Sequence, residues 1–242
     1  MDKVLLITKR ELSSYFTTWT GYIVVFAALL INGLLFNAFA IGDSPKFSSD
    51  VLRDFFFYSS GIAMVAAIFL AMRLLAEEKQ TGTIILFYTS PITERQLVYG
   101  KFLSVVVVFL ILQALSLHLP SLIFIEGKVS IGHMAAGYLG VILIGSAVLA
   151  IALFGSVVAS NQMIAAVIGA SITVVLLLLW IVANRVDEPF SSLFSYISLH
   201  NFRFRPFSGG IVHIKDLIYY FSLILFFLES SVRALETRRL QG

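Results

Sequence analysis

The sequence predicts an all-α integral membrane protein with six transmembrane helices. Of its 242 residues, 59% are hydrophobic and only 13% are charged, whereas soluble domains carry about 25% charged residues. Six apolar segments each approach the ~20 residues that a helix needs to cross a bilayer. With a mean hydropathy of +0.94, the chain has too few polar residues to cover a water-exposed surface. We therefore expect a lipid bilayer around it.

The composition and motifs also exclude several function classes. The chain has no cysteine, so a disulfide framework and a thiolate metal site are excluded. The net charge of +3 fits a membrane protein better than a nucleic-acid binder. No GxxxxGK[ST] phosphate loop and no HExxH pattern is present, so we expect no ATP site and no metal or other cofactor in this chain. His118 alone among the histidines lies within a span, and a hydrogen-bonding or packing role is expected for it.

Residues 1–19 predict an amphipathic helix that lies in the membrane interface. At about 100° per residue, one face is apolar and consists of Leu5, Leu12, Tyr15, Phe16 and Trp19. The opposite face is polar and basic and consists of Lys3, Arg10, Ser13, Ser14 and Thr17. Leu6 and Ile7 break this pattern. Such a helix either anchors the chain in the interface or docks a partner, and both interpretations stay open.

The apolar runs define the spans and the turns between them. The spans are expected at residues 21–41, 55–75, 102–125, 134–159, 163–183 and 214–232. The sixth has the shortest clean run, because Lys215 and Asp216 lie at its start. The first run is long enough to span and no small-residue cleavage site follows it, so no cleavable signal peptide is expected. Small residues four apart at Ala165, Gly169 and Thr173 predict close helix packing.

The basic residues predict the orientation of the bundle. With the amino terminus inside, ten of the 17 lysines and arginines fall on the inner side and seven on the outer side. Cytoplasmic loops carry the excess of these residues. We therefore expect both termini to be cytoplasmic.

The longest outer connection, residues 184–213, is not purely polar. Residues 189–199 (PFSSLFSYISL) are apolar, and an arginine–aromatic patch follows at residues 202–207 (FRFRPF). Non-helical backbone at membrane depth persists only when it is buried in protein or lines a cavity. This favours one or two short interfacial or re-entrant helices packed over the outer end of the bundle, the alternative being an ordinary loop.

A polar stretch rich in turn signals, residues 73–101 (RLLAEEKQTGTIILFYTSPITERQLVYGK), lies between the second and third spans. Gly82 interrupts the helix that leaves the second span. Residues 84–88 are apolar but too few to cross a bilayer, so they need a partner to bury them. Ser90 before Pro91 predicts a helix N-cap with proline at the first helical position. A plain cytoplasmic loop is the alternative.

This stretch resembles the signature of ABC-2 type permeases. The matching positions are an arginine, an acidic pair, a Gly-Thr, an apolar run, a Ser-Pro and a Gly-Lys, here Arg73, Glu77 and Glu78, Gly82 and Thr83, Ile84 to Phe87, Ser90 and Pro91, and Gly100 and Lys101. The family usually has Glu-Leu where this chain has Ile84-Ile85. The amino-terminal segment resembles the family's interfacial connecting helix. The segments SNQMIAA and LIYYFSLILFFLESSVRALETRRL resemble its gliding-motility-associated and nitrous-oxide-reductase-associated branches, the former more closely.

The resemblance implies the fold of ABC-2, or type V, exporters and a membrane subunit without catalytic activity. It implies a second permease protomer, identical or different, and a separate ABC ATPase that holds ATP and Mg²⁺, in a bacterial cytoplasmic (inner) membrane. A coupling helix in residues 76–101 would contact the ATPase through Glu77, Glu78, Gly82, Thr83, Ile84, Leu86, Phe87 and Pro91, with both glutamates as surface charges. Arg73 would anchor the end of the second span. Phe190, Phe194, Tyr196 and Phe202 would belong to helices that cap an outer gate.

Three functions stay open from the sequence. The first is the permease subunit of an ATP-driven exporter. The second is a mechanotransmission subunit, which uses the same ATPase to act on an extracytoplasmic partner without moving a solute. The third is a scaffold without an ATPase. The gliding-type resemblance adds an auxiliary extracytoplasmic subunit to the expected partners.

Overall fold

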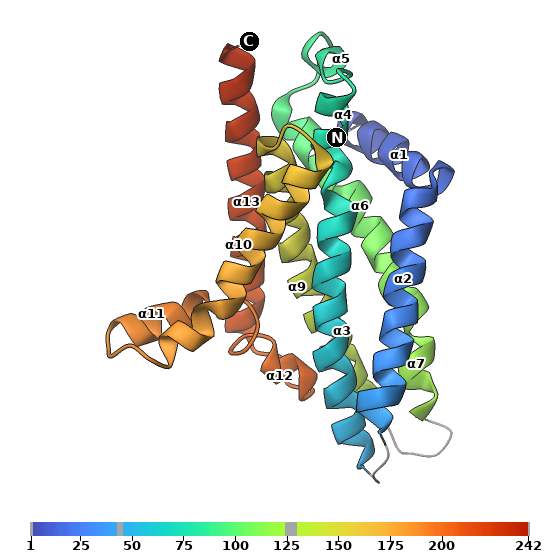
Figure 1. Ribbon diagram of the computed structural model, residues 1–242, viewed down its shortest axis with the longest axis vertical. Helices are drawn as coiled ribbons and strands as arrows, with labels where there is room; N and C mark the ends of the chain where they lie inside the picture. Colours follow the sequence, from blue (N-terminus) through green and yellow to red (C-terminus); the bar gives the residue numbers. More distant parts are fainter. Residues whose placement is uncertain (1, 43–45, 124–129, 242) are drawn as a thin grey trace.

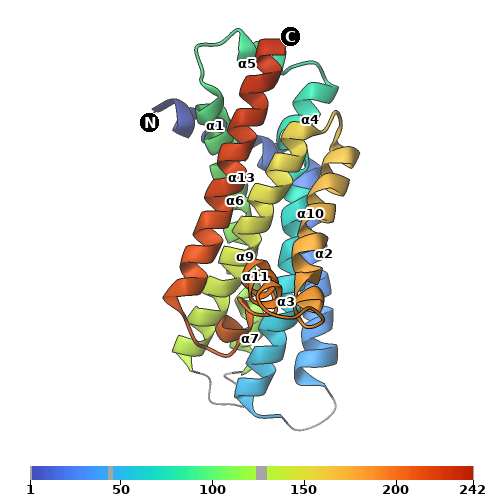
Figure 2. The same ribbon diagram turned by 90° about the vertical axis from the view of Figure 1, so that its left-hand side faces the viewer.

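Six helices in the described residues are long and apolar enough to cross a membrane. The computed structural model describes residues 2–42, 46–123 and 130–241, and every regular element within these ranges is helical. The long helices run side by side in one elongated bundle (Figure 1). Figure 2 shows that the C-terminal end of the chain and the short helix α5 (Ile85–Tyr88) lie at the same end, called here the α5 end. The six-helix prediction is confirmed.

The spans are built from single helices or from two consecutive ones. In chain order they are α2 (Trp19–Leu35) with η1 (Phe36–Ile41), α3 (Ser48–Ala71) with α4 (Arg73–Gln80), α6 (Glu94–Ser116) with α7 (His118–Ser121), α9 (Ile131–Val158), α10 (Gln162–Ala183) and α13 (Ile214–Gln241). The helices extend beyond several predicted spans, because hydropathy marks only the apolar part of a helix. Its backbone hydrogen bonds continue through polar end turns. The predicted coupling region, residues 76–101, therefore contains the end of α4 and the start of α6.

The helix α9 lies at the centre of the bundle. Its most apolar window is 83% buried, against 17% for α10 and 22% for the first span. Small residues make this possible, because a Cβ at Gly155 would lie 2.9 Å from the carbonyl oxygen of Ala165. Ala165, Gly169 and Thr173 are all buried, so the small-residue face predicted on α10 is confirmed as its contact with α9.

The amino-terminal helix α1 (Asp2–Thr17) packs across α6 before the chain turns into α2 (Figure 1). An N-terminal helix is confirmed, but its buried face differs from the predicted one. Ile7 and Tyr15 are 6% and 4% exposed, whereas Phe16 and Trp19 are 47% and 82% exposed. Ile7, which breaks the predicted apolar face, is buried because the contact with α6 follows positions spaced three and four apart.

Two short helices form in the connection between α10 and α13. They are α11 (Phe190–Ile197) and α12 (Arg205–Ser208). α12 packs on α9 and α3 near the end opposite α5, as expected, and a Cβ at Gly140 of α9 would lie 2.5 Å from the Cβ of Phe207. α11 instead packs on α10 and projects sideways from the bundle (Figure 1). The expected position over the bundle end is therefore wrong for α11.

Candidate functional site

The turn between the second and third spans extends beyond the apolar part of the bundle. α3 and α4 together form a 33-residue span, about 50 Å long, whereas the hydrocarbon core of a bilayer is about 30 Å thick. Gly82 ends this helix with a φ of +73°, a conformation that glycine adopts without steric cost. The backbone N–H groups of Thr81 and Gly82 donate to the carbonyls of Glu77 and Lys79. α5 follows at the tip of the bundle.

α5 carries one buried and two exposed apolar side chains. Ile85 and Leu86 are 63% and 66% exposed, whereas Phe87 is 7% exposed. The guanidinium of Arg10 lies 5.3 Å from the centre of the Phe87 ring, and the ammonium of Lys101 lies 5.5 Å from it. Phe87 thus fixes α5 on the bundle while Ile85 and Leu86 point away from it.

The residues around α5 complete a compact turn. The Thr83 hydroxyl lies 2.9 Å from that of Thr81, and Ile84 is half-buried. Pro91 is not at the first position of a helix; its carbonyl accepts a hydrogen bond from Lys3 at 2.6 Å. The N-cap predicted at Ser90 is therefore wrong, because Ser90 donates to the carbonyl of Phe87 at 2.8 Å instead.

The helix α6 begins instead after Thr93. The Thr93 hydroxyl accepts from the backbone N–H of Gln96, and the Gln96 side chain accepts from that of Thr93, which forms a capping box. This reciprocal arrangement satisfies two donors at the helix start. The signal, Thr-Glu-Arg-Gln, is present in the sequence and begins two residues after Pro91.

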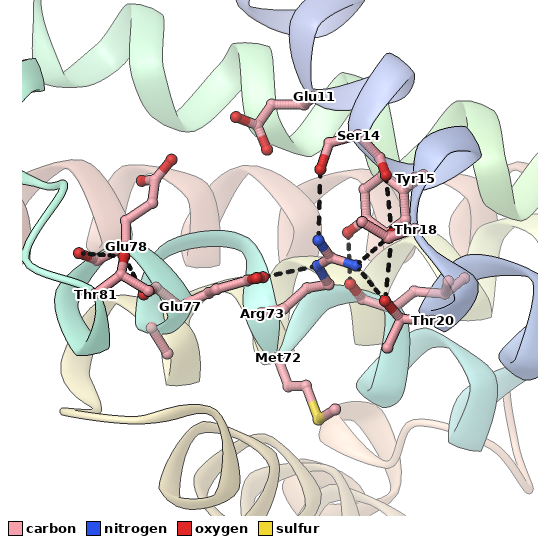
Figure 3. Close-up of polar contacts among 12 residues, drawn as sticks. Glu11, Ser14, Tyr15, Thr18, Thr20, Met72, Arg73, Glu77, Glu78 and Thr81 are labelled. Carbon is pink, nitrogen blue, oxygen red and sulfur yellow. Dashed lines mark hydrogen bonds and ion pairs between the residues drawn. The ribbon is translucent and has the colours of Figure 1, made fainter.

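Arg73 ties the start of α4 to the corner between α1 and α2 (Figure 3). Its guanidinium donates to the hydroxyls of Thr18 at 3.1 Å, Thr20 at 2.7 Å and Ser14 at 3.4 Å. It also pairs with Glu77 at 2.9 Å. The role as an anchor stays a prediction, and these contacts identify what it would hold.

Tyr15 reinforces the same corner. Its ring lies 5.1 Å from the Arg73 guanidinium, and its hydroxyl donates to the carbonyl of Leu70 at 2.6 Å. Burial raises the pKa of Tyr15 well above its ordinary value, so the phenol stays a hydrogen-bond donor at alkaline pH as well.

The two glutamates of α4 have different surroundings. The side chain of Glu77 is 39% exposed, as expected of a surface charge. The side chain of Glu78 is only 14% exposed and pairs with Lys101 at 2.7 Å, so its predicted surface position is wrong. Adjacent helical residues point about 100° apart, which directs Glu78 toward α6. Both line a polar cavity of about 240 Å³ below α5.

The end of α13 also reaches the α5 end. Arg95 of α6 pairs with Glu229 at 2.8 Å, and the Tyr99 hydroxyl donates to the same carboxylate at 2.9 Å. Arg239 pairs with Glu94 at the start of α6. These contacts between α6 and α13 were not predicted, because their partners lie 130 or more residues apart in the chain.

The four predicted gate residues lie in the connection before α13. Phe190, Phe194 and Tyr196 belong to α11, on which no residue is buried. Phe202 precedes α12 and is 44% exposed. Their gating role stays a prediction.

A buried ion pair in this connection was missed. Arg203 and Asp216 lie 2.9 Å apart, with side chains 8% and 0% exposed. The Arg203 guanidinium also lies 4.3 Å and 5.0 Å from the rings of Tyr196 and Tyr219. The arginine–aromatic patch was visible in the sequence. In the sequence Asp216 shortens the apolar run of the sixth span, whereas in the fold it joins that span to the outer connection.

The described residues contain no cluster suited to bind a metal ion. Within residues 2–42, 46–123 and 130–241, no group of three or more His, Asp or Glu side chains is placed to hold a metal ion. His118 contacts the carbonyl of Leu115 at 2.6 Å, which matches the hydrogen-bonding role expected for it.

Comparison with known proteins identifies the family. The family model described as ABC-2 family transporter protein matches residues 34–224, which is well over half of the 242-residue chain. No curated protein matches the sequence significantly. The matched region contains α3 to α12 and thus the whole turn around α5. The chain is therefore a multi-pass membrane protein that belongs to the ABC-2 transporter family.

Proposed function

We propose that this chain is the permease subunit of an ATP-driven exporter and that a separate ABC ATPase binds to α5. The exposed apolar pair Ile85 and Leu86 at the tip of the bundle carries this proposal. Membership of the ABC-2 family supports an ABC ATPase as the partner. ATP and Mg²⁺ would be bound by that subunit, and this chain would have no catalytic role.

The geometry of α5 supports a docking function for physical reasons. Ile85 and Leu86 lie beyond the apolar length of the bundle, so lipid tails are not expected to cover them. Exposed apolar side chains rimmed by polar residues mark protein–protein contacts. Thr81 and Thr83, both exposed, supply such a rim. The buried Phe87 ring fixes the orientation of the turn, which reduces the entropy lost on binding.

The proposal also sets the assembly and the orientation. The α5 end would face the cytoplasm, together with both termini, in a bacterial cytoplasmic membrane. The low burial of α10 and α2 leaves apolar surface for lipid and for a second permease protomer. An outer gate formed by α11 and α12, and an auxiliary extracytoplasmic subunit, belong to the same proposal.

The test is purification of the chain from its native membrane, with identification of the proteins that accompany it. We expect an ATPase subunit at a one-to-one ratio. Leu86→Asp should abolish its recovery without loss of this chain from the membrane. Thr89→Asp, which adds the same charge to an exposed polar position of the turn, should retain it. Purification of the wild-type chain without any ATPase, or full recovery with Leu86→Asp, would overturn the proposal.

The same preparation separates export from mechanotransmission. An ATPase rate that changes with an added solute supports export. A rate that responds only to an added extracytoplasmic protein supports the mechanotransmission alternative. The Leu86→Asp and Thr89→Asp pair tests the docking surface in either case.

A further inference from the structure

Lys101 is a fully buried cation at the start of the third span. Its side chain is 1% exposed and lies between two carboxylates, 3.0 Å from Glu11 of α1 and 2.7 Å from Glu78 of α4. Each carboxylate side chain is 14% exposed. A buried ammonium is costly unless it is paired and hydrogen-bonded. Lys101 thus holds together helices that begin the chain, end the second span and begin the third.

Gly100 makes this arrangement possible. A Cβ at Gly100 would lie 2.8 Å from the Cβ of Ile7 and 3.1 Å from the carbonyl oxygen of Val4. The Thr8 hydroxyl donates to the carbonyl of Gly100 at 3.0 Å. α1 therefore lies directly against the backbone of α6. One turn after Ile7, the carboxylate of Glu11 pairs with Lys101. Gly100 therefore allows α1 to approach α6 closely, and Lys101 holds it there.

The same lysine reaches α5. Its ammonium lies 5.5 Å from the centre of the Phe87 ring, the buried anchor of the proposed docking turn. If residues 84–88 formed a plain exposed loop, no buried charge would be needed beneath them. Buried ion pairs are in general no more stabilising than apolar residues of similar volume, and their best-attested contribution is a fixed arrangement of the parts they join. Lys101 is therefore better explained as a residue that fixes the arrangement of the helices around it than as one that only stabilises the fold.

We propose that Lys101 is a positioning residue that locks α1, α4 and α5 onto α6, so that a displacement of α5 is passed to the membrane helices as a rigid-body motion. This inference rests on the proposed docking of an ATPase at α5 but concerns a separate step. Binding depends on the exposed Ile85 and Leu86, whereas transmission depends on the buried lysine and its two carboxylates. Loss of the lock should leave the ATPase bound but uncoupled.

The absence of cysteine from the chain allows a direct test with spin labels at two introduced cysteines. Lys9 of α1 and Thr89 after α5 are both exposed, and a label pair there reports the distance between the two elements in the purified chain, with or without a bound ATPase. We expect a single narrow distance distribution in the wild-type background. Lys101→Met should broaden it and lower the permease-dependent ATPase rate roughly tenfold, within the range typical of coupling between sites. The ATPase should still co-purify at one to one.

Two further variants separate positioning from folding. Lys46→Met removes a cation that pairs with Asp54 at 2.8 Å near the other end of the bundle, and it should change neither readout. The triple variant Glu11→Gln, Glu78→Gln, Lys101→Met leaves no buried charge unpaired. If it restores the narrow distribution and the ATPase rate, Lys101 merely neutralises its neighbours and the proposal is wrong. If both defects persist in a folded complex, the positioning role is supported.

The label distance also keeps this inference distinct from the proposed function. It is measured on this chain and requires no ATPase. A wild-type chain that purifies without an ATPase would overturn the docking proposal, yet broadening by Lys101→Met would still support the lock. A distribution that stays narrow in Lys101→Met would overturn the lock whether or not an ATPase binds.

Discussion

Replacing either of two glycines in the interior of long helices by alanine is predicted to change the stability of the bundle, in opposite directions. At Gly155 of α9, a Cβ would lie 2.9 Å from the carbonyl oxygen of Ala165 and 3.0 Å from the backbone nitrogen of Gly169. At Gly61 of α3, a Cβ would have no neighbour within 4 Å. Gly155→Ala should therefore destabilise the bundle, and Gly61→Ala should stabilise it.

The size of each change in stability follows from two contributions to the free energy of unfolding. Alanine gains about 1 kcal/mol over glycine in a helix interior, and this gain applies at both positions. At Gly155 it is opposed by overpacking, which costs about 1–3 kcal/mol, because the facing atoms are backbone atoms that no rotamer change can move. The difference between the two variants isolates the steric term. It corresponds to roughly 2–12 °C in Tm for a chain of this size.

Thermal unfolding of the purified chain in one lipid or detergent measures this difference. Tryptophan fluorescence is a suitable signal because Trp180 belongs to α10, the helix that Gly155 faces. The expected order of Tm is Gly61→Ala, wild type, Gly155→Ala. If Gly155→Ala melts at the same temperature as Gly61→Ala or above it, α9 and α10 do not pack at backbone contact and the reasoning is wrong.

Other groups give predictions of the same kind. Ser156→Ala should lower the free energy of unfolding by about 3 kcal/mol, because the buried hydroxyl accepts from the N–H groups of Leu75 and Ala76 and donates to the carbonyl of Met72, each at 2.9 Å. Its Tm should fall further than that of Ser171→Ala, at an exposed position on α10, and equal shifts would contradict it. Burial lowers the pKa of His200 from 6.5 to about 4; the unfolded chain therefore takes up a proton at a higher pH, and stability should fall by up to about 3 kcal/mol as the pH decreases from 6.5 to 4. A His200→Gln variant should lose this part of the pH dependence of Tm, and parallel curves for the two proteins would rule it out.

Hydropathy predicted the spans because the bilayer itself imposes the signal. A helix that crosses hydrocarbon needs a continuous apolar run of about 20 residues. Such a run can be recognised from neighbouring residues in the sequence alone. Helix ends follow weaker signals that compete with one another. Ser90-Pro91 and Thr93-x-x-Gln96 both indicate a helix start, and the reciprocal bonds of the capping box at Thr93 decide between them.

The polar contacts between elements could not be predicted in the same way. Glu11 and Lys101 are 90 positions apart, and which faces meet depends on how α1 lies across α6. The apolar residues of α1 did not identify its buried face. Phe16 and Trp19 are exposed, whereas Ile7 lies against Gly100. The surface position predicted for Glu78 is wrong for the same reason. A charged residue is expected at the surface unless its buried partner is known, and the partner, Lys101, lies on another helix.

The central helix α9 contacts α4 near the α5 end of the bundle and α12 toward the other end. Near the α5 end it is polar: Ser156 bonds the backbone where α3 passes into α4, and Lys79 donates to the carbonyls of Val157 and Ala159. Toward the other end it contacts α12 through both apolar and polar groups: Gly140 lies against Phe207, and the His133 ring lies 2.8 Å from the carbonyl oxygen of Ser208. Displacing α4 from α9 would leave buried N–H groups unsatisfied, which is costly inside a membrane protein. α4 and α9 are therefore held as one unit, and α12 rests on the same helix.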